Sequence, residues 1–147
     1  YDVLRPPEQR PADLLERLWY GPSMENLRAI LDEHTPRVVL TTSWTRFLDR
    51  PAFEALFRAT GLVALADGLH DAWEAPQNTG ETRCAAIERW LARHHRGEPF
   101  VVLDDPLSGT GLAGSALDGD GRVVLCEVGK GLSSLHLALA RRALSLP

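Results

Sequence analysis

The sequence has 147 residues, of which 44% are hydrophobic and 24% charged, and a formal net charge of −4, values typical of one globular domain with a single core. No apolar run approaches the roughly 20 residues that span a bilayer, and residues 1–11 lack the basic-then-apolar pattern of a signal peptide, which indicates a cytoplasmic protein. Because the arginines are spread along the chain and Lys130 is the only lysine, a long, tightly held nucleic acid is disfavoured.

Segments with helical and strand patterns follow one another along the chain. Apolar residues at helical spacing predict helices over residues 10–20, 23–34, 51–61, 81–95 and 133–146. Short apolar, β-branched runs predict strands over 37–44, 100–105 and 122–128. Residues 62–68 are either a strand or the tail of the preceding helix, and the polar residues 67–80 are expected to form a loop. Strands that alternate with helices in this way indicate an α/β fold with a mainly parallel sheet covered on both faces.

Two of the predicted strands end in polar clusters. These are the hydroxyl cluster Thr41, Thr42 and Ser43 and the carboxylate pair Asp104 and Asp105. Ligands of open parallel sheets bind just beyond the carboxyl ends of the strands. Hydroxyls there suit the oxygens of an anion, and carboxylates suit a hard cation such as Mg²⁺. Arg83 begins the helix that lies between the two clusters in sequence, where it would neutralise a phosphate or a developing phosphoryl charge.

Each of these groups also has a purely structural interpretation. A strand followed by Asp-Asp-Pro is often a turn with a capping aspartate, and a Thr-Thr-Ser cluster more often serves turns and caps than ligands. Arg83 alone is more typical of a solvated helix residue than of a phosphate clamp. Cys84 and Cys126 fit neither a disulfide framework nor a metal knuckle. The order of the groups along one α/β pattern is what favours a site.

That order resembles the haloacid dehalogenase (HAD) superfamily of phosphatases, and most closely the HAD domain of Swiss-army-knife RNA repair proteins. The resemblance rests on four segments within residues 37–144, which are VVLTTSW, TRCAAIERWL, FVVLDD and GKGLSSLHLALARRAL. It implies a Rossmann-like three-layer α/β/α sandwich. Residues 5–36 and 67–80 leave no room for a large lid, so the cap is expected to be minimal.

The resemblance also implies roles for individual residues. Thr42, helped by Ser43, would hold the phosphoryl oxygens, and Arg83 would balance their charge. Asp104 and Asp105 would complete a Mg²⁺ site, which lets an anionic nucleophile approach an anionic phosphate. The pair of like charges at the end of a buried strand would then be offset by the cation.

The catalytic aspartates raise a separate question. In the family, a nucleophilic aspartate at the end of the first strand forms an aspartyl-phosphate, and a second aspartate two residues later acts as acid and base. Asp2 matches the second position, as catalytic residue and metal ligand, so the first strand and the nucleophile are expected upstream of Tyr1. Two alternatives stay open: the strands on either side close up in an inactive domain, or Asp2 itself is the nucleophile on a shortened strand.

These features together predict a Mg²⁺-dependent phosphohydrolase. An open site accepts a phosphate on a bulky molecule, with nucleic-acid ends or nucleotides as candidate substrates, and Trp73 would either stack on a base or pack. The alternative is an inactive HAD-like module that binds a phosphorylated ligand or a protein partner. A response-regulator-like receiver domain ranks third, because its acidic pair normally follows the first strand.

Overall fold

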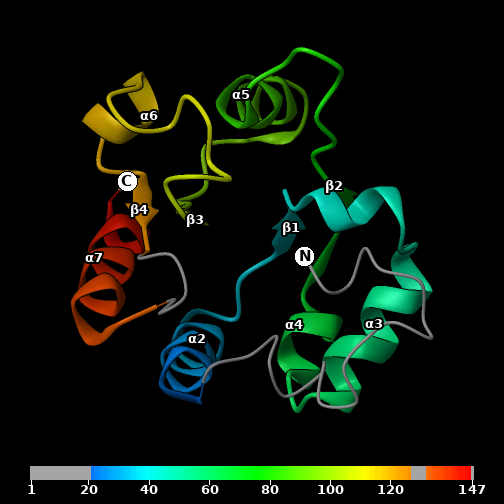
Figure 1. The fold of residues 1–147 in the computed structure, drawn as a ribbon. Helices are drawn as coiled ribbons and strands as arrows, with labels where there is room; N and C mark the ends of the chain where they lie inside the picture. The colour runs from blue at the N-terminus through cyan, green and yellow to red at the C-terminus, as the bar shows by residue number, and fades with distance from the viewer. Residues whose placement is uncertain (1–20, 127–131, 147) are drawn as a thin grey trace.

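The computed structural model describes residues 21–126 and 132–146, so the predicted helix over residues 10–20 lies outside the described part. Helices and strands alternate along the chain (Figure 1). Their bounds are α2 (Gly21–His34), β1 (Val38–Leu40), the 3-10 helix η3 (Ser43–Arg46), α3 (Arg50–Ala59), α4 (Val63–Asp67), β2 (Leu69–Glu74), α5 (Arg83–His94), β3 (Val102–Asp104), α6 (Ala116–Gly119), β4 (Val123–Leu125) and α7 (Ser134–Ser145). None of these helices is long and apolar enough to cross a membrane.

The four described strands form two separate parallel pairs. One pair is β1 with β2, and the other is β3 with β4. The β3–β4 register is regular, whereas the β1–β2 register shifts between Val38 and Leu40. The prediction of an α/β fold with parallel strands is therefore confirmed, but the described residues do not form one continuous sheet.

Three local predictions need correction. Residues 67–80 were expected to form a loop, yet Leu69–Glu74 is strand β2, because pairing with β1 outweighs its polar composition. Residues 62–68 contain the separate short helix α4, which follows a turn at Gly61 with φ of 82°. The strand expected over residues 37–44 ends at Leu40.

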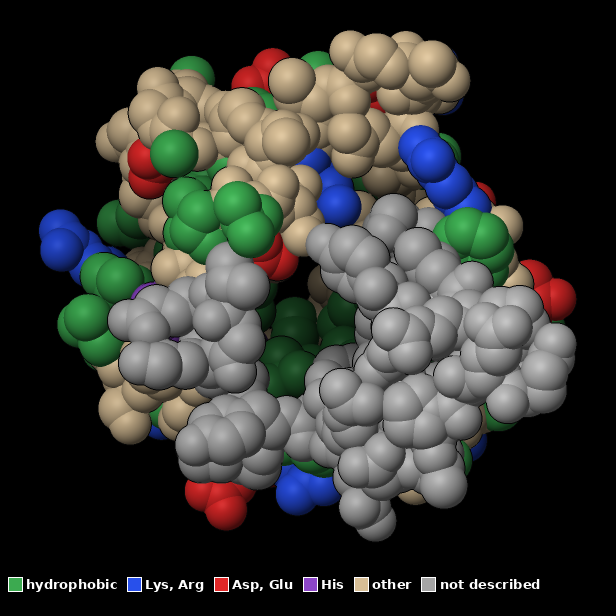
Figure 2. Space-filling view, in the orientation of Figure 1, with side chains coloured by type: hydrophobic (Ala, Val, Ile, Leu, Met, Phe, Trp, Pro, Cys, Tyr) green, Lys and Arg blue, Asp and Glu red, His purple; other side chains and the backbone are tan. Residues whose placement is uncertain are grey.

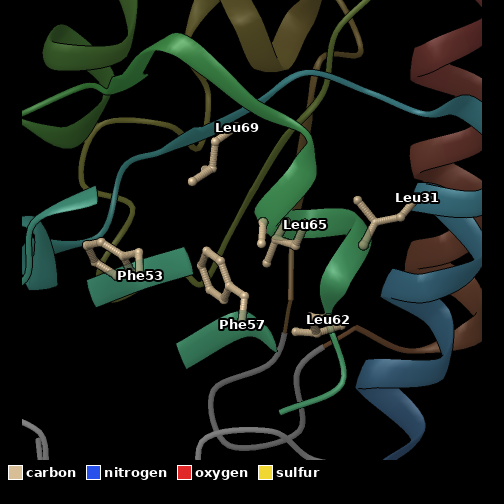
Figure 3. Packing of buried hydrophobic residues seen from close by; sticks show 7 residues of the cluster. Leu31, Phe53, Phe57, Leu62, Leu65 and Leu69 are labelled. Carbon is tan, nitrogen blue, oxygen red and sulfur yellow. The ribbon is translucent and has the colours of Figure 1, made fainter. Parts of the chain in front are cut away.

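The hydrophobic core consists of three clusters. The first packs α3 and α4 against α2 and β2 (Figure 3), through the residues Leu31, Phe53, Phe57, Leu62, Leu65, Ala66 and Leu69. The second includes Ile30 of α2 with β4 and α7, and the third includes Ile87 of α5 with β3. Trp73 packs on Phe53 with ring centroids 5.8 Å apart, which agrees with the packing alternative for this residue.

Two helices bridge the two strand pairs. Helix α2 contributes neighbouring residues to different clusters, because Leu31 packs towards β2 and Ile30 towards β4. Helix α5 packs Ile87 on β3, and its Trp90 Nε1 donates a hydrogen bond of 2.9 Å to the carbonyl of Ala72 in β2. In Figure 1, α5 lies above the strands and α2 lies below them. The two pairs are therefore held in one body by a helix on each side.

A capping box begins the last helix, α7, and provides a test of its local stability. The Ser133 hydroxyl accepts from the His136 N–H, and His136 Nδ1 accepts from the Ser133 N–H at 3.1 Å. We expect Ser133→Ala to lower the free energy of unfolding by about 1 kcal/mol, because the His136 N–H in the first turn loses its acceptor. Urea denaturation measures the loss, and Ser134→Ala at the next, exposed position is the control. Equal effects of both substitutions would contradict the capping role.

Candidate active site

The carboxyl ends of β1 and β3 meet at the guanidinium of Arg83. Its Nη1 donates to Thr41 Oγ1 at 3.4 Å and to Asp104 Oδ2 at 3.1 Å, and its Nε donates to Gln77 Oε1 at 3.2 Å. Thr41 directly follows β1 and Asp104 ends β3. One buried side chain, 8% exposed, thus joins the ends of strands from the two separate pairs. Both strands therefore end at the same edge of the domain.

Local structure fixes where Arg83 lies. Thr82 caps the N-terminus of α5 by accepting from the Ala85 N–H at 3.1 Å. The two amides that follow Thr82 donate to Thr110, in the loop after β3. The Arg83 N–H donates to Thr110 Oγ1 at 2.8 Å, and the Cys84 N–H donates to the Thr110 carbonyl at 3.0 Å. The first turn of α5 is consequently tied to the segment that carries the two aspartates.

The two aspartates have different surroundings. Asp104 Oδ1 accepts from the Asp105 N–H at 2.8 Å, while Oδ2 binds Arg83. Asp105 Oδ1 accepts from the N–H groups of Leu107 and Ser108 at 2.9 and 2.8 Å, which is a turn of the Asx type. Asp105 therefore caps a turn, as the structural alternative for the Asp-Asp-Pro segment predicts. Its Oδ2 has no hydrogen bond within residues 21–126 and 132–146, so this turn leaves one carboxylate oxygen for a ligand.

The electrostatic environment of the site is negative. Burial raises the pKa of the Asp104 carboxyl, and the charge of Asp105 adds to this effect, while the Asp105 amide and the Arg83 guanidinium oppose it. Burial, with the negative charges of Asp104 and Asp105, also raises the pKa of the Cys126 thiol to about 11. Of the two neighbouring aspartates only Asp104 pairs with Arg83, so a bound cation would add to the stabilisation of the ionised Asp104 carboxylate.

The predicted site residues are only partly brought together. Arg83, Asp104 and Asp105 lie in one place, but the hydroxyl that contacts Arg83 belongs to Thr41 and not to Thr42. The Thr42 carbonyl accepts from the Thr45 N–H and hydroxyl. The side chain of Ser43 and all of Asp2 lie outside the described residues.

The sequence patterns did not single out Thr41 within its cluster and gave Gln77 and Thr110 no role. Thr41 belongs to the predicted hydroxyl cluster, and the signal that distinguishes it is that β1 ends one residue earlier, at Leu40. The Ala75 N–H donates to the Leu40 carbonyl at 2.9 Å, which makes Thr41 the first hydroxyl beyond the paired strand. Gln77 and Thr110 come from loops, and no sequence signal marks them.

Parallel strands, helices on both sides and an arginine that joins a carboxylate and a hydroxyl at the carboxyl ends of β1 and β3 define an α/β domain. Residues 3–137 match the family described as the HAD domain in Swiss Army Knife RNA repair proteins. The chain therefore belongs to this family, as its motifs predict, and membership suggests a hydrolase or phosphatase type of function. No curated protein and no solved structure shows significant similarity to the chain.

Proposed function

We propose that this domain is a Mg²⁺-dependent phosphohydrolase that acts through an aspartyl-phosphate on phosphate monoesters at nucleic-acid ends or on nucleotides. The observation that carries the proposal is the buried contact of Arg83 with both Thr41 and Asp104. It brings an anion-binding hydroxyl, a guanidinium and a carboxylate to one edge of the strands, in the family to which the chain belongs.

The phosphate would bind between Arg83 and the hydroxyls that follow β1. Nη2 of Arg83 has no hydrogen bond within the described ranges, and guanidinium N–H groups match phosphoryl oxygens in charge and geometry. Thr41 is already bound to this guanidinium, with Thr42 and Ser43 next in the chain. In this arrangement Arg83 holds the transferring group in line and stabilises the charge that develops on it.

The residues at the site fit Mg²⁺. This ion binds through one or two carboxylates together with substrate phosphate and water, and Asp104 and Asp105 supply two adjacent carboxylates. Within residues 21–126 and 132–146, no group of three acidic, histidine or cysteine side chains could hold a metal, so Asp2 is proposed as the further ligand. When bound, Mg²⁺ would reduce the repulsion between an anionic nucleophile and the phosphate.

The chemical steps are assigned to two aspartates. The carboxylate two residues before Asp2 would attack phosphorus, and the bond from phosphorus to the leaving oxygen would break while Asp2 donates a proton to that oxygen. Asp2 would then take a proton from water, which cleaves the aspartyl-phosphate, regenerates the carboxylate and releases inorganic phosphate. The role of Arg83 throughout is to bind and orient the phosphoryl group.

The test compares the chain of residues 1–147 with one that is extended upstream by its native residues. Hydrolysis of p-nitrophenyl phosphate and of 3′- and 5′-phosphorylated oligonucleotides is measured with Mg²⁺ and with EDTA. We expect activity in the extended chain alone, lost with EDTA and with Asp104→Asn, whose folding is checked by circular dichroism. A folded extended chain that hydrolyses none of these substrates would overturn the proposal and favour a phosphate-binding module without activity.

A further inference from the structure

A glutamine from the loop between β2 and α5 completes the contacts of the Arg83 guanidinium. A guanidinium has five N–H donors, one on Nε and two on each Nη atom. Nη1 bonds to Thr41 Oγ1 and Asp104 Oδ2, and the Nε donor bonds to Gln77 Oε1 at 3.2 Å. Nε and Nη1 are therefore both engaged, and only Nη2 has no hydrogen bond within residues 21–126 and 132–146.

The amide of Gln77 fits its neighbours in only one orientation. Its Oε1 accepts from Arg83 Nε, and its Nε2 donates to the Glu81 carbonyl. With the two ends of the amide exchanged, a donor would face the Arg83 N–H and an acceptor would face a carbonyl oxygen, so both bonds would be lost. The bond to Glu81 thus directs the oxygen of Gln77 at the guanidinium.

The loop that carries Gln77 is held on two sides. Arg89 of α5 donates to the Pro76 carbonyl at 2.6 Å and to Glu81 Oε1 at 2.9 Å. The Gln77 carbonyl accepts from Arg46 Nη2 at 3.4 Å, at the end of η3. Gln77 is therefore in position before a ligand binds, as a group that orients a functional side chain must be.

The orientation of Arg83 matters because most of this side chain is covered. It is only 8% exposed, so the direction of the guanidinium decides which of its N–H groups a ligand meets. Figure 2 shows basic and acidic side chains next to one another below α5, on the rim of a hollow near the centre of the molecule. A ligand that enters from this face meets charged groups.

The lack of charge on Gln77 matters as well. Asp104 already pairs with Arg83, and both side chains are buried. A second carboxylate on Nε would give the guanidinium two negative partners and would repel a phosphate. An amide oxygen holds the same N–H without adding charge, which leaves more of the positive charge of Arg83 for an anionic ligand.

We propose that Gln77 is a positioning residue of the site. Its uncharged amide fixes the guanidinium of Arg83 in one orientation, with Nη2 directed at the phosphoryl group. This role rests on the proposed phosphohydrolase function, in which Arg83 binds the phosphoryl group. Gln77 acts through Arg83 and makes no contact of its own with the substrate.

Two substitutions of Gln77 separate orientation from charge. Gln77→Met and Gln77→Glu both remove the donor to the Glu81 carbonyl, so they differ in what faces Arg83 Nε, a thioether or a carboxylate. Both are made in the chain extended upstream by its native residues and assayed with Mg²⁺. We expect Gln77→Met to lower kcat for p-nitrophenyl phosphate about 10-fold and to change KM by less than about 3-fold, because the phosphate still binds but is less well oriented.

The charge effect is measured by the binding of inorganic phosphate in a calorimeter. We expect Gln77→Glu to bind phosphate about 10-fold more weakly than Gln77→Met, because the added carboxylate repels it. Urea denaturation should rank the two variants in the opposite order, since the same carboxylate pairs with Arg83 and makes Gln77→Glu at least as stable. A merely structural role predicts that binding and stability fall together.

Asn78→Met is the control in the same loop. Asn78 is exposed, and its side chain has no hydrogen bond within the described ranges, so kcat and phosphate binding should stay unchanged. Equal phosphate binding by Gln77→Met and Gln77→Glu would overturn the role of Gln77, as would an unchanged kcat of Gln77→Met in an active chain.

The calorimetric readout separates this role from catalysis. If the extended chain binds phosphate but hydrolyses no substrate, the catalytic proposal fails, and the difference in phosphate binding between the two variants still decides the role of Gln77. A folded extended chain that hydrolyses substrate while both variants bind phosphate equally would support catalysis and refute the role of Gln77. A folded extended chain that binds no phosphate would overturn both.

Discussion

Replacing Arg83 with methionine is expected to lower the free energy of unfolding by about 3–5 kcal/mol, because it leaves a buried carboxylate without its partner. The side chains of Arg83 and Asp104 are each only 8% exposed, and Nη1 lies 3.1 Å from Oδ2. Methionine keeps the volume of the stem but removes the charge that Asp104 and Thr41 contact. Urea denaturation measures the stability, and the same substitution should abolish phosphatase activity in the extended chain.

A matched control for this experiment lies on the same helix. Arg89 pairs with Glu81 at 2.9 Å, but both side chains are partly exposed, so Arg89→Met is expected to cost about 1 kcal/mol or less. The double substitution Arg83→Met with Asp104→Leu should recover part of the loss, because it removes both charges. If Asp104→Leu destabilises the Arg83→Met variant as much as it destabilises the unchanged chain, the two effects are independent, which would contradict the pairing.

The pH dependence of Arg83→Met follows from the pKa of Asp104. Burial already raises this pKa in the native state, and Arg83 is one of the groups that lower it. Without Arg83 the folded-state pKa rises further above the unfolded value, so the folded form binds a proton that the unfolded form releases. The stability of the variant, relative to the unchanged chain, should therefore rise as the pH falls towards the unfolded-state pKa of an aspartate, about 3.9. A destabilisation that stays constant from neutral pH down to this value would refute the explanation.

The second large effect is expected from Gly109→Ala. Gly109 is buried, and a Cβ at this position would lie 2.8 Å from Leu112 Cδ1, 2.9 Å from the Asp105 carbonyl oxygen and 3.2 Å from Asp104 Cβ. The extra carbon must push the two aspartates, so we expect a stability loss of about 1–3 kcal/mol. Activity of the extended chain should fall by about 100-fold, since a displacement near 1 Å has effects of this order on positioned groups.

Gly119→Ala is the matched control for this substitution. Gly119 lies in α6, and nothing stands within 4 Å of the position of its Cβ. The substitution is expected to leave activity unchanged and to alter stability by less than about 1 kcal/mol. Full activity of Gly109→Ala, at normal kcat and KM, would show that the loop after β3 does not position the aspartates.

The elements that the sequence predicts well are those with a local cause. Helix α5 has its apolar residues at helical spacing and a threonine cap at Thr82, and both signals lie within its own segment. The strand that ends in Asp104 is a short β-branched run followed by a turn whose aspartate caps it, so Asp105 is also a local feature. Strand β2 has no such pattern. It forms because its backbone bonds to β1, some 30 residues earlier in the chain.

Motif order along the chain predicts the family and the parallel α/β class, and composition at the strand ends predicts that Arg83, Asp104 and Asp105 lie near one another, because these signals are local. That Thr41 is the hydroxyl in contact with Arg83 does not follow from the sequence, since the end of β1 depends on the pairing of β1 with the distant strand β2. The division of the described strands into two pairs, β1 with β2 and β3 with β4, is likewise a property of the tertiary structure, because hydrogen bonding between distant segments sets which strands pair.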